Sequence, residues 1–380
     1  MSSTIHLQWK DAATTGRFRT GVSLHSHTLH SRESLDFIYH AAKRAPILSA
    51  AIRHGEGVYQ RIHGAALDLG RGWWTPPLGA HDAWLVEKSQ IEALDQNAIV
   101  SITDHDNIEA PVSLQVLDEC RGTAISVEWT VPFGPTFFHL GVHNLPAGRA
   151  RALWAQMDRY RHNPDEAQLY KTKLGEILTM LASLDHVLIV FNHPLWDERG
   201  IGHAAHREVA LEFLRQFGSS LHALELNGMR PWKENRDVLA LARAAQKPVI
   251  SGGDRHAIEP NALLNFTNAE TFDEFAEEVR GGWSSVFVLR HYREQYAQRI
   301  LHNMIDVLRS YERHANGWVL WSDRVFYLCH DGQTRSLTQL FGERPPAAVA
   351  LFVGAMKFAS APRVRRFLRG AFAGPEEVTL

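Results

Sequence analysis

Two histidines two residues apart open the part of the sequence that could do chemistry. The stretch "GVSLHSHTLHSRESLDF" (21–37) begins as a short apolar strand and places His25 and His27 at its end. Residues i and i+2 of an extended segment point to the same side, so these two imidazoles face the same way. Because neutral imidazole is a common ligand of transition metals, the pair predicts a metal site where this strand ends.

Polar side chains capable of binding a metal also lie in or just after six further apolar stretches, which we predict to be strands. The stretches cover 97–105, 123–130, 136–144, 186–194, 221–228 and 248–256. The side chains are Asp104, His105, Asp106, Glu128, His139, His143, Asn192, His193, Glu225, Asp254 and His256. Each one alone has an ordinary explanation, such as a helix N-cap for Asp106 or a partner arginine for Glu225. Their recurrence at one end of successive strands favours a shared site.

Segments with helical periodicity separate most of these strands, at 170–184, 206–217, 235–246 and 271–280. Apolar strands that alternate with helices indicate a parallel sheet covered by helices. Seven or eight such units predict an α/β fold with a closed or distorted (β/α) barrel rather than an open sheet. In such barrels the active site lies at the carboxyl ends of the strands, where these side chains occur.

Two regions interrupt the alternation. Residues 41–90 are rich in Gly, Trp and His without a clear period, and we interpret them as an insertion that forms a lid over the barrel mouth. Trp73, Trp74 and Trp84 in this region either pack on the barrel or stack on a nucleobase or sugar. Residues 291–380 begin with a helical pattern and end with the basic stretch "PRVRRFLRG". We therefore expect a barrel over 1–290 and a helical extension over 291–380.

Composition narrows the function classes. The 380 residues are 45% hydrophobic and 22% charged with a formal net charge of −2, which gives no global attraction to long nucleic acid or membranes. Two cysteines, Cys120 and Cys329, form neither a disulfide framework nor a thiolate zinc site, and the start of the chain lacks a signal-peptide pattern, so we expect a cytoplasmic protein. The apolar run 347–359 is shorter than the ~20 residues of a membrane span and is expected to be a buried helix.

The donor set indicates which ions would bind. Imidazole and carboxylate without thiolate suit Zn, Mn or Fe(II) better than Ca²⁺ or a structural zinc site. Two or three such divalent ions, with neighbours ~3.5–4 Å apart, are typical of enzymes in which a metal-bridging hydroxide attacks phosphorus. We therefore expect a hydrolase, with His25 and His27 binding one of its ions.

Six motifs in order resemble the PHP (polymerase and histidinol phosphatase) superfamily of metal-dependent phosphoesterases. They are "LHSHTLHS", "VSITDHDN", "ISVEW", "FFHLG", "FNHP" and "SGGDRH", spread over residues 21–260. The resemblance implies a distorted (β/α)7 barrel, a TIM-like PHP fold, whose two or three ions hydrolyse phosphate esters. It implies a first ion held by His25, His27, Glu128 and Asp254, a second held by Glu128, His139 and His193, and a third at His105 and His256.

The first motif departs from the family at one point. Where many relatives continue Ser-Asp-Gly and the Asp serves the third ion, this chain has Ser31-Arg32-Glu33. Three alternatives follow. Glu33 binds the third ion with its longer side chain, or the third site is weak or absent, or Arg32 takes the place of an ion and binds the substrate phosphate directly.

For the reaction itself we expect Arg199 and Arg255 to bind the substrate phosphate, and His30 or His143 to protonate the leaving oxygen. The expected substrate is a small phosphorylated metabolite or a nucleotide. Two alternatives remain open: a regulatory module that binds a metal or ligand without catalysis, and a nuclease acting on DNA or RNA. The near-neutral charge and the absence of an interleaved basic and aromatic groove make long nucleic acid unlikely.

Overall fold

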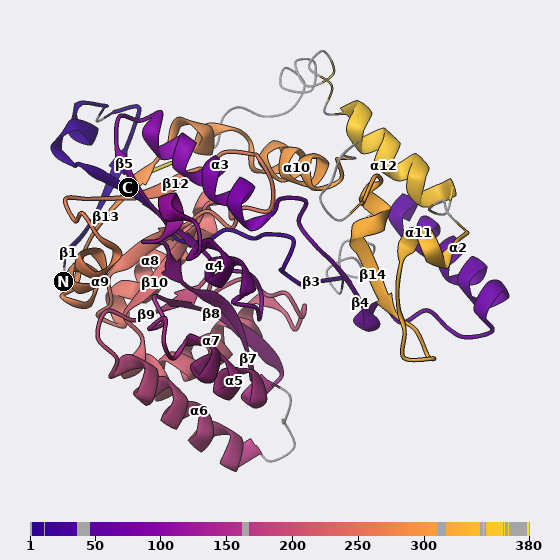
Figure 1. Cartoon of the computed structure of the whole chain (residues 1–380), viewed down its shortest axis with the longest axis horizontal. Helices are drawn as coiled ribbons and strands as arrows, with labels where there is room; N and C mark the ends of the chain where they lie inside the picture. Colours follow the sequence, from indigo (N-terminus) through magenta and orange to yellow (C-terminus); the bar gives the residue numbers. More distant parts are fainter. Residues whose placement is uncertain are drawn as a thin grey trace.

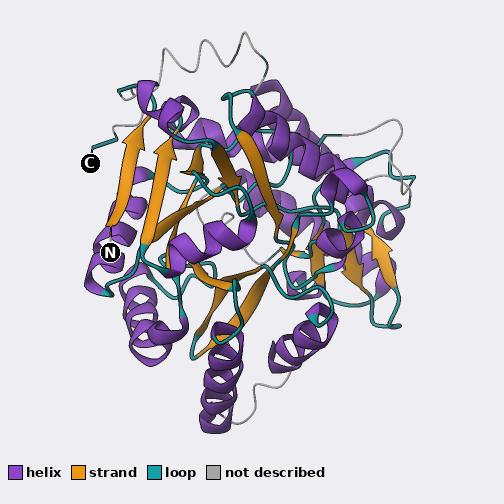
Figure 2. Cartoon of the chain, turned by 60° about the vertical axis from the view of Figure 1, so that its left-hand side comes forward, coloured by secondary structure: helices purple, strands orange, loops and turns teal. Residues whose placement is uncertain are grey.

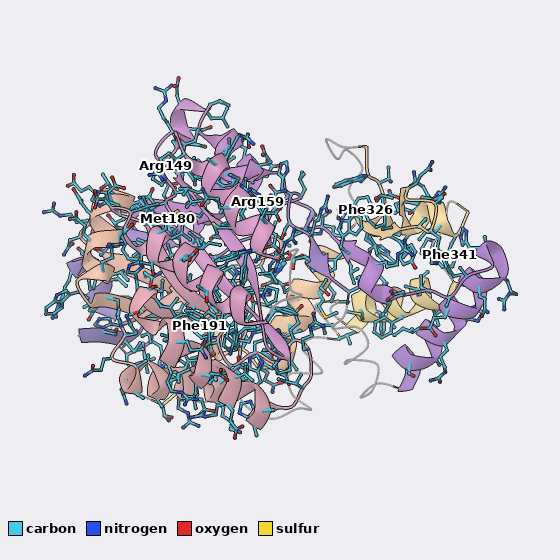
Figure 3. The ribbon with its side chains drawn as sticks, turned by 90° about the horizontal axis from the view of Figure 1, so that it is seen from below. Arg149, Arg159, Met180, Phe191, Phe326 and Phe341 are labelled. Carbon is cyan, nitrogen blue, oxygen red and sulfur yellow. The ribbon has the colours of Figure 1, made fainter. Side chains whose placement is uncertain are left out.

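The computed structural model describes residues 2–10, 12–35, 46–161, 167–309, 317–342 and 347–359, with single positions 345, 361, 364, 378 and 379. Its main body contains two β-sheets with helices packed around them, and a smaller lobe lies at one side (Figures 1 and 2). Phe191 lies inside the main body, whereas Phe326 and Phe341 lie in the lobe (Figure 3).

The first sheet of the main body has six strands and the second has five. The first runs in the order β1 (Ser2–Leu7), β13 (Trp283–Val288), β12 (Leu263–Thr267), β2 (Thr20–Ser23), β5 (Asn97–Ile102) and β6 (Ala124–Ile125). The second runs in the order β11 (Val249–Gly252), β10 (Ala223–Asn227), β9 (Leu188–Asn192), β8 (Thr136–His143) and β7 (Val127–Phe133). All five residues of β9 and all five of β10 are buried, as expected for strands covered on both faces.

Helices cover these sheets. In chain order they are α3 (Ala80–Glu92), α4 (Glu109–Leu114), α5 (Ala150–Arg161), α6 (Ala167–Ala182), α7 (His203–Phe217), α8 (Trp232–Ala244), α9 (Phe272–Arg280) and α10 (Tyr296–Val307). Those from α6 to α10 lie where the sequence periodicity predicts helices, whereas α3, α4 and α5 were not predicted. Helix α9 shows the pattern clearly, because Phe272, Phe275, Ala276 and Val279 are buried at a spacing of three and four residues. The α/β class is therefore confirmed.

The strand pairing is less regular than the predicted alternation. Strands β9, β10 and β11 are parallel, but β7 and β8 form an antiparallel hairpin around Gly134, and β12 runs antiparallel to both of its neighbours. In the described residues the two sheets meet through isolated bridges, Ser26 to Arg255 and His105 to Glu128. A closed barrel of seven units is thus not confirmed. Both bridges lie beside residues predicted to bind metal.

Parts of the two regions that interrupt the alternation, 41–90 and 291–380, contribute to one small lobe. Strands β3 (Glu33–Ser34) and β4 (Gly72–Trp74) form one antiparallel sheet with β14 (Val325–Leu328) and β15 (Thr334–Ser336). Helices α2 (Pro46–His63), α11 (Leu337–Leu340) and α12 (Ala347–Ala359) complete this lobe (Figure 1). Two expectations need correction here. Residues 80–92 of the supposed insertion form α3, which packs on β5, and the extension contains a β-hairpin as well as helices.

The exposure of helix α12 differs from what the sequence predicts. Its apolar sequence predicts a buried helix, yet Leu351 is 79% exposed and Phe358 is 70% exposed, while Val353 is buried. None of the helices in the described ranges combines the length and the apolar character that a membrane crossing requires. Most of the basic stretch 362–370 lies outside the described residues.

Candidate metal centre

Most of the side chains predicted to bind metal follow the carboxyl ends of strands, whereas Glu128, His139 and Glu33 lie within strands. His25 and His27 follow β2, His105 follows β5, His193 follows β9, and Asp254 and His256 follow β11. Two of these residues, His193 and Asp254, have positive φ angles of 25° and 54°. Non-glycine residues rarely adopt such angles, and they do so most often at functional sites.

Glu128 of β7 is the centre of the cluster and is fully buried. Five imidazoles lie within 3.5 Å of its two carboxylate oxygens; they belong to His25, His27, His105, His139 and His193. The shortest distance is 2.9 Å, from Oε2 to Nε2 of His25, and Oε1 lies 3.1 Å from Nε2 of His193. The two oxygens therefore face two different groups of imidazoles, an arrangement that suits a carboxylate shared between two ions.

Two further carboxylates complete the cluster. Asp254 Oδ1 lies 3.5 Å from Nε2 of His27, and Glu33 Oε2 lies 3.3 Å from Nε2 of both His105 and His256. All nine predicted ligands thus lie in one buried cluster. This outcome favours the alternative in which Glu33 serves the third ion. The role of the nine as ligands stays a prediction.

The donor atoms fit divalent metal ions. Four overlapping sets of three donors have their ligand atoms within 4.8 Å of one another: His25–Glu128–His193, His25–His27–Asp254, His27–His105–Glu128 and His27–Glu33–His256. Nε2 of His27 is buried and has no hydrogen-bond partner among the described residues, although a buried polar atom usually has one. A metal ion would satisfy this nitrogen, and nitrogen and oxygen donors without thiolate match the ions expected from the sequence.

The charges in the cluster depend strongly on one another. Burial would raise the pKa of Glu128, but the surrounding imidazoles of His105 and His25 hold this pKa well below its usual value. Burial likewise opposes a charge on His25, yet Glu128 and Glu225 raise its pKa well above the ordinary value. His27 behaves differently, because burial and the neighbouring His256 lower its pKa to about 4. His27 is therefore neutral at pH 7, the form that can bind a metal.

Glu225 of β10 contacts the cluster through His25; in the sequence it is among the side chains able to bind a metal, but it was assigned to no ion. Its Oε1 lies 2.6 Å from Nδ1 of His25, and its Oε2 accepts hydrogen bonds from the backbone N–H of His193 and the amide of Asn227. Its position in the strand "ALELN", next to the other ligand-bearing strands, was the available signal. Carboxylates that bind the second nitrogen of a metal-binding imidazole fix its orientation and increase its basicity.

Ser31 is a second supporting residue that sequence reasoning missed. Its hydroxyl donates to Oε1 of Glu33 at 2.6 Å and accepts a hydrogen bond from the backbone N–H of His105 at 2.9 Å. Nearby, burial raises the pKa of Asp104 to about 7, and this carboxyl accepts hydrogen bonds from Thr28. These contacts anchor the loop that carries His27 and Glu33.

Of the four residues predicted to act on substrate, Arg199, His30 and His143 have different surroundings. Arg199 is exposed, with its guanidinium 5.3 Å from the centre of the Phe137 ring, which in turn lies 5.2 Å from the ring of His139. His30 is partly buried, and burial lowers its pKa. A lowered pKa disfavours the protonated form that a proton donor needs. His143, the other predicted proton donor, is buried, and its Nδ1 forms a hydrogen bond with the hydroxyl of Ser101.

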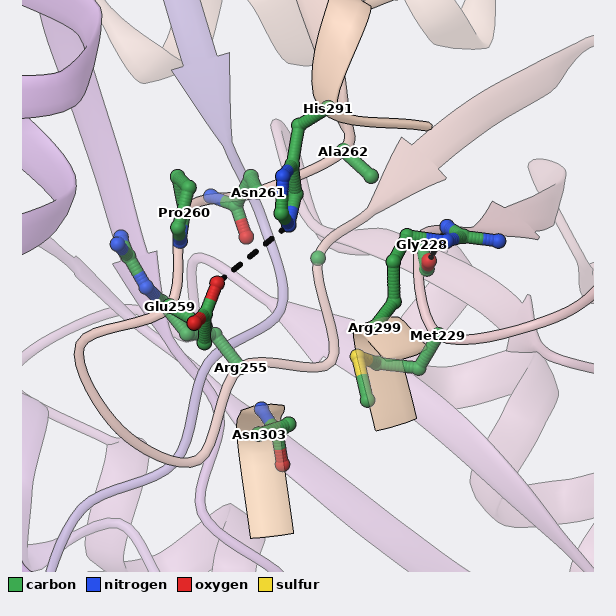
Figure 4. Close-up of a pocket in the computed structure, with 11 residues that line it drawn as sticks. Gly228, Met229, Arg255, Glu259, Pro260, Asn261, Ala262, His291, Arg299 and Asn303 are labelled. Carbon is green, nitrogen blue, oxygen red and sulfur yellow. Dashed lines mark hydrogen bonds and ion pairs between the residues drawn. The ribbon is translucent and has the colours of Figure 1, made fainter. Parts of the chain in front are cut away.

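Arg255 does not have the position that phosphate binding requires, and this expectation is corrected. Its side chain is 5% exposed and forms a buried ion pair with Glu87 at 3.2 Å, while another nitrogen donates to the carbonyl of Ile258. It lines a separate small pocket beside α10, in which Glu259 and His291 form an ion pair (Figure 4). Its charge is therefore already balanced by a buried carboxylate.

Arg230 is the arginine that the structure brings to the cluster instead. Its Nη2 lies 3.6 Å from Oδ2 of Asp254, and its guanidinium lies 3.7 Å from the centre of the Trp196 ring. The side chain is 12% exposed. Stacking on an indole fixes the guanidinium plane next to the candidate ligand, and it reduces the flexibility that an arginine has in water. The sequence offered no signal, because "GMRPW" (228–232) looks like an ordinary turn.

The chain was compared with known proteins in three ways. No protein-family model matches it, and no curated protein matches it. The solved structures that are similar at low identity include the following two. A proposed metal-dependent phosphoesterase from Bifidobacterium adolescentis is 12% identical, with a TM-score of 0.32 over 54% of this chain and 91% of that one. An amidohydrolase from Chromobacterium violaceum, solved with sulfate and no metal, is 15% identical, with a TM-score of 0.31 over 50% and 86%.

Proposed function

We propose that this chain is a metal-dependent hydrolase of phosphate esters, with two or three divalent ions in the cluster around Glu128. The observation that carries the proposal is the convergence of five imidazoles on the two oxygens of this one buried carboxylate. We further propose that the two sheets form a distorted (β/α)7 barrel of the PHP type, whose strand ends support this cluster.

The proposed ligand sets are those that the resemblance to the PHP superfamily implies. His25, His27 and Asp254 would hold one ion with Glu128, and His139 and His193 would hold a second on the other oxygen of Glu128. His105, His256 and Glu33 would hold a third. When bound, such ions neutralise charge on a phosphoryl group and supply a nucleophilic hydroxide at neutral pH.

The remaining steps belong to the side chains of the protein. Arg230 donates from its guanidinium to the non-bridging oxygens of the phosphate, in the fixed plane that Trp196 imposes. Arg199, at the exposed edge near His139, attracts the anionic substrate from solution. Glu225 keeps the imidazole of His25 in one orientation by binding its Nδ1. The substrate is a small phosphorylated metabolite or a nucleotide.

Turnover of phosphate esters tests the proposal. Purified protein should hydrolyse a chromogenic phosphomonoester or phosphodiester with added Mn²⁺, lose this activity with a chelator, and regain it when metal is restored. Glu128→Ala should abolish turnover, whereas Glu212→Ala, at an exposed carboxylate paired with Lys171, should not. Metal-loaded protein without turnover on any such ester would overturn the catalytic proposal and favour the binding module.

A further inference from the structure

Glu33 belongs both to the small lobe and to the candidate metal centre. As a residue of β3, at the edge of the lobe sheet, it pairs in register with Trp74 of β4. Its carboxylate nevertheless lies in the cluster, 3.3 Å from Nε2 of His105 and 3.3 Å from Nε2 of His256. It is 6% exposed. One side chain therefore joins two parts of the fold.

The neighbouring strand of the lobe also contacts the cluster. The indole of Trp74 lies 5.4 Å from the imidazole of His256, with an angle of 37° between the rings. Its Nε1 is buried and has no hydrogen-bond partner among the described residues. The contact with His256 places Trp74 on the same side of the cluster as Glu33.

The far end of the chain holds this arrangement in place. Trp74 pairs in register with Val325 of β14, and the backbone N–H of Thr75 donates to the carbonyl of Arg324 at 2.9 Å. The Arg324 side chain is 2% exposed and donates to the carbonyls of Val307 and Arg309 at the end of α10. A continuous path of backbone pairing thus runs from Glu33 through β4 to a segment about 290 residues later in the sequence.

We propose that the lobe is a component of the metal centre, and that ion binding at His105, His256 and Glu33 and docking of the lobe are coupled. An ion between the two imidazoles and Glu33 fixes β3, and β3 fixes β4 and β14 through their hydrogen bonds. Because the coupling is reciprocal, undocking of the lobe weakens this ion site by the same factor. The inference rests on metal binding, which is part of the proposed function, but not on the reaction.

Amide hydrogen exchange measures this coupling without any need for turnover. Peptides that cover 72–75 and 325–328 should exchange roughly tenfold more slowly when the full chain is saturated with Mn²⁺ than when it is metal-free, within the usual range of coupling between two sites. In Glu33→Gln, which keeps the shape of the side chain and removes its charge, this slowing should be lost.

His139→Gln is the matched control, because His139 lies in the cluster but makes no contact with the lobe strands among its described interactions. It should keep the metal-dependent slowing in 72–75 and 325–328. Equal slowing in the wild type and Glu33→Gln would overturn the coupling, and so would no slowing in a wild type that binds metal. A lobe that responds to metal in a protein without turnover would support this inference and contradict only the catalytic proposal.

Discussion

Glu225 Oε1 lies 2.6 Å from Nδ1 of His25, on the side of the imidazole opposite to Glu128. Both carboxylates are buried, and the strands that carry them, β10 and β7, belong to the same five-stranded sheet. His25 is thus held between a supporting carboxylate and the proposed bridging carboxylate.

The first prediction concerns this support. Glu225→Gln should weaken binding of the ion held by His25 by about 10- to 100-fold, because a neutral amide oxygen accepts from Nδ1 of His25 more weakly than a carboxylate and does not increase the basicity of the ring. Competition against a fluorescent chelator measures the affinity. Glu212→Gln, an exposed change of the same chemistry, is the control. An affinity for metal in Glu225→Gln equal to that of the wild type would show that Glu225 does not support the site.

The second prediction concerns Gly252, the last residue of β11. A Cβ atom at this position would lie 1.5 Å from Oε1 of Glu225, which leaves no room for any side chain. Gly252→Ala should therefore displace Glu225, lower stability by about 1–3 kcal/mol, as overpacking typically does, and weaken metal binding. Thermal unfolding with and without Mn²⁺ measures both effects. Gly148→Ala, where nothing lies within 4 Å, should behave as the wild type. A Gly252→Ala protein with wild-type stability and metal binding would contradict the packing described here.

The third prediction separates the arginines. Arg230→Met should raise the inhibition constant for inorganic phosphate and the KM for a phosphomonoester by about 10- to 100-fold, because a charge-assisted hydrogen bond contributes about 1.5–3 kcal/mol. Arg199→Met should mainly reduce the rate of substrate association at low salt. Trp196 lies beneath Arg230, so phosphate binding should also change the part of the tryptophan fluorescence that Trp196→Phe removes. Unchanged phosphate affinity in Arg230→Met would exclude it as the anion-binding group.

The fourth prediction concerns pH. Burial lowers the pKa of His143 to about 3, so the folded protein binds fewer protons than the unfolded chain between about pH 6.5 and 3. Stability must then fall as the pH falls through this window. For this one group the loss is about 2 kcal/mol between pH 6.5 and 5. His143→Gln should reduce the pH dependence by that amount, measured by denaturant unfolding of metal-free protein. The same slope in both proteins would mean that His143 does not titrate as described.

Much of the cluster was predictable because it depends on a simple rule. The carboxyl ends of successive strands meet at one edge, so His25, His105 and His193 could be assigned to one site before their distances were known. The antiparallel hairpin of β7 and β8 changes the topology, yet Glu128 and His139 still reach the cluster.

What the sequence could not predict depends on contacts between distant segments. Arg255 follows Asp254 in the sequence, and this position predicts a role in binding phosphate. In the structure Arg255 forms an ion pair with Glu87 of α3, a helix in the segment that the sequence predicts to be a lid. Arg230 belongs to no recognisable sequence motif, and its guanidinium is held in place by stacking on the ring of Trp196. The lobe is the clearest case, because Trp74 and Val325 pair across a gap of about 250 residues that no local pattern records.

The metal content of the protein tests the central claim most directly. Elemental analysis by mass spectrometry, after reconstitution with Zn²⁺, Mn²⁺ or Fe²⁺ and removal of free ions, gives the number of ions per chain. The account predicts at least two tightly bound ions in the wild type, and at most one in Glu128→Ala, since the first and the second proposed ion share this carboxylate. Fewer than one ion per wild-type chain with every metal, or an unchanged number in Glu128→Ala, would contradict it.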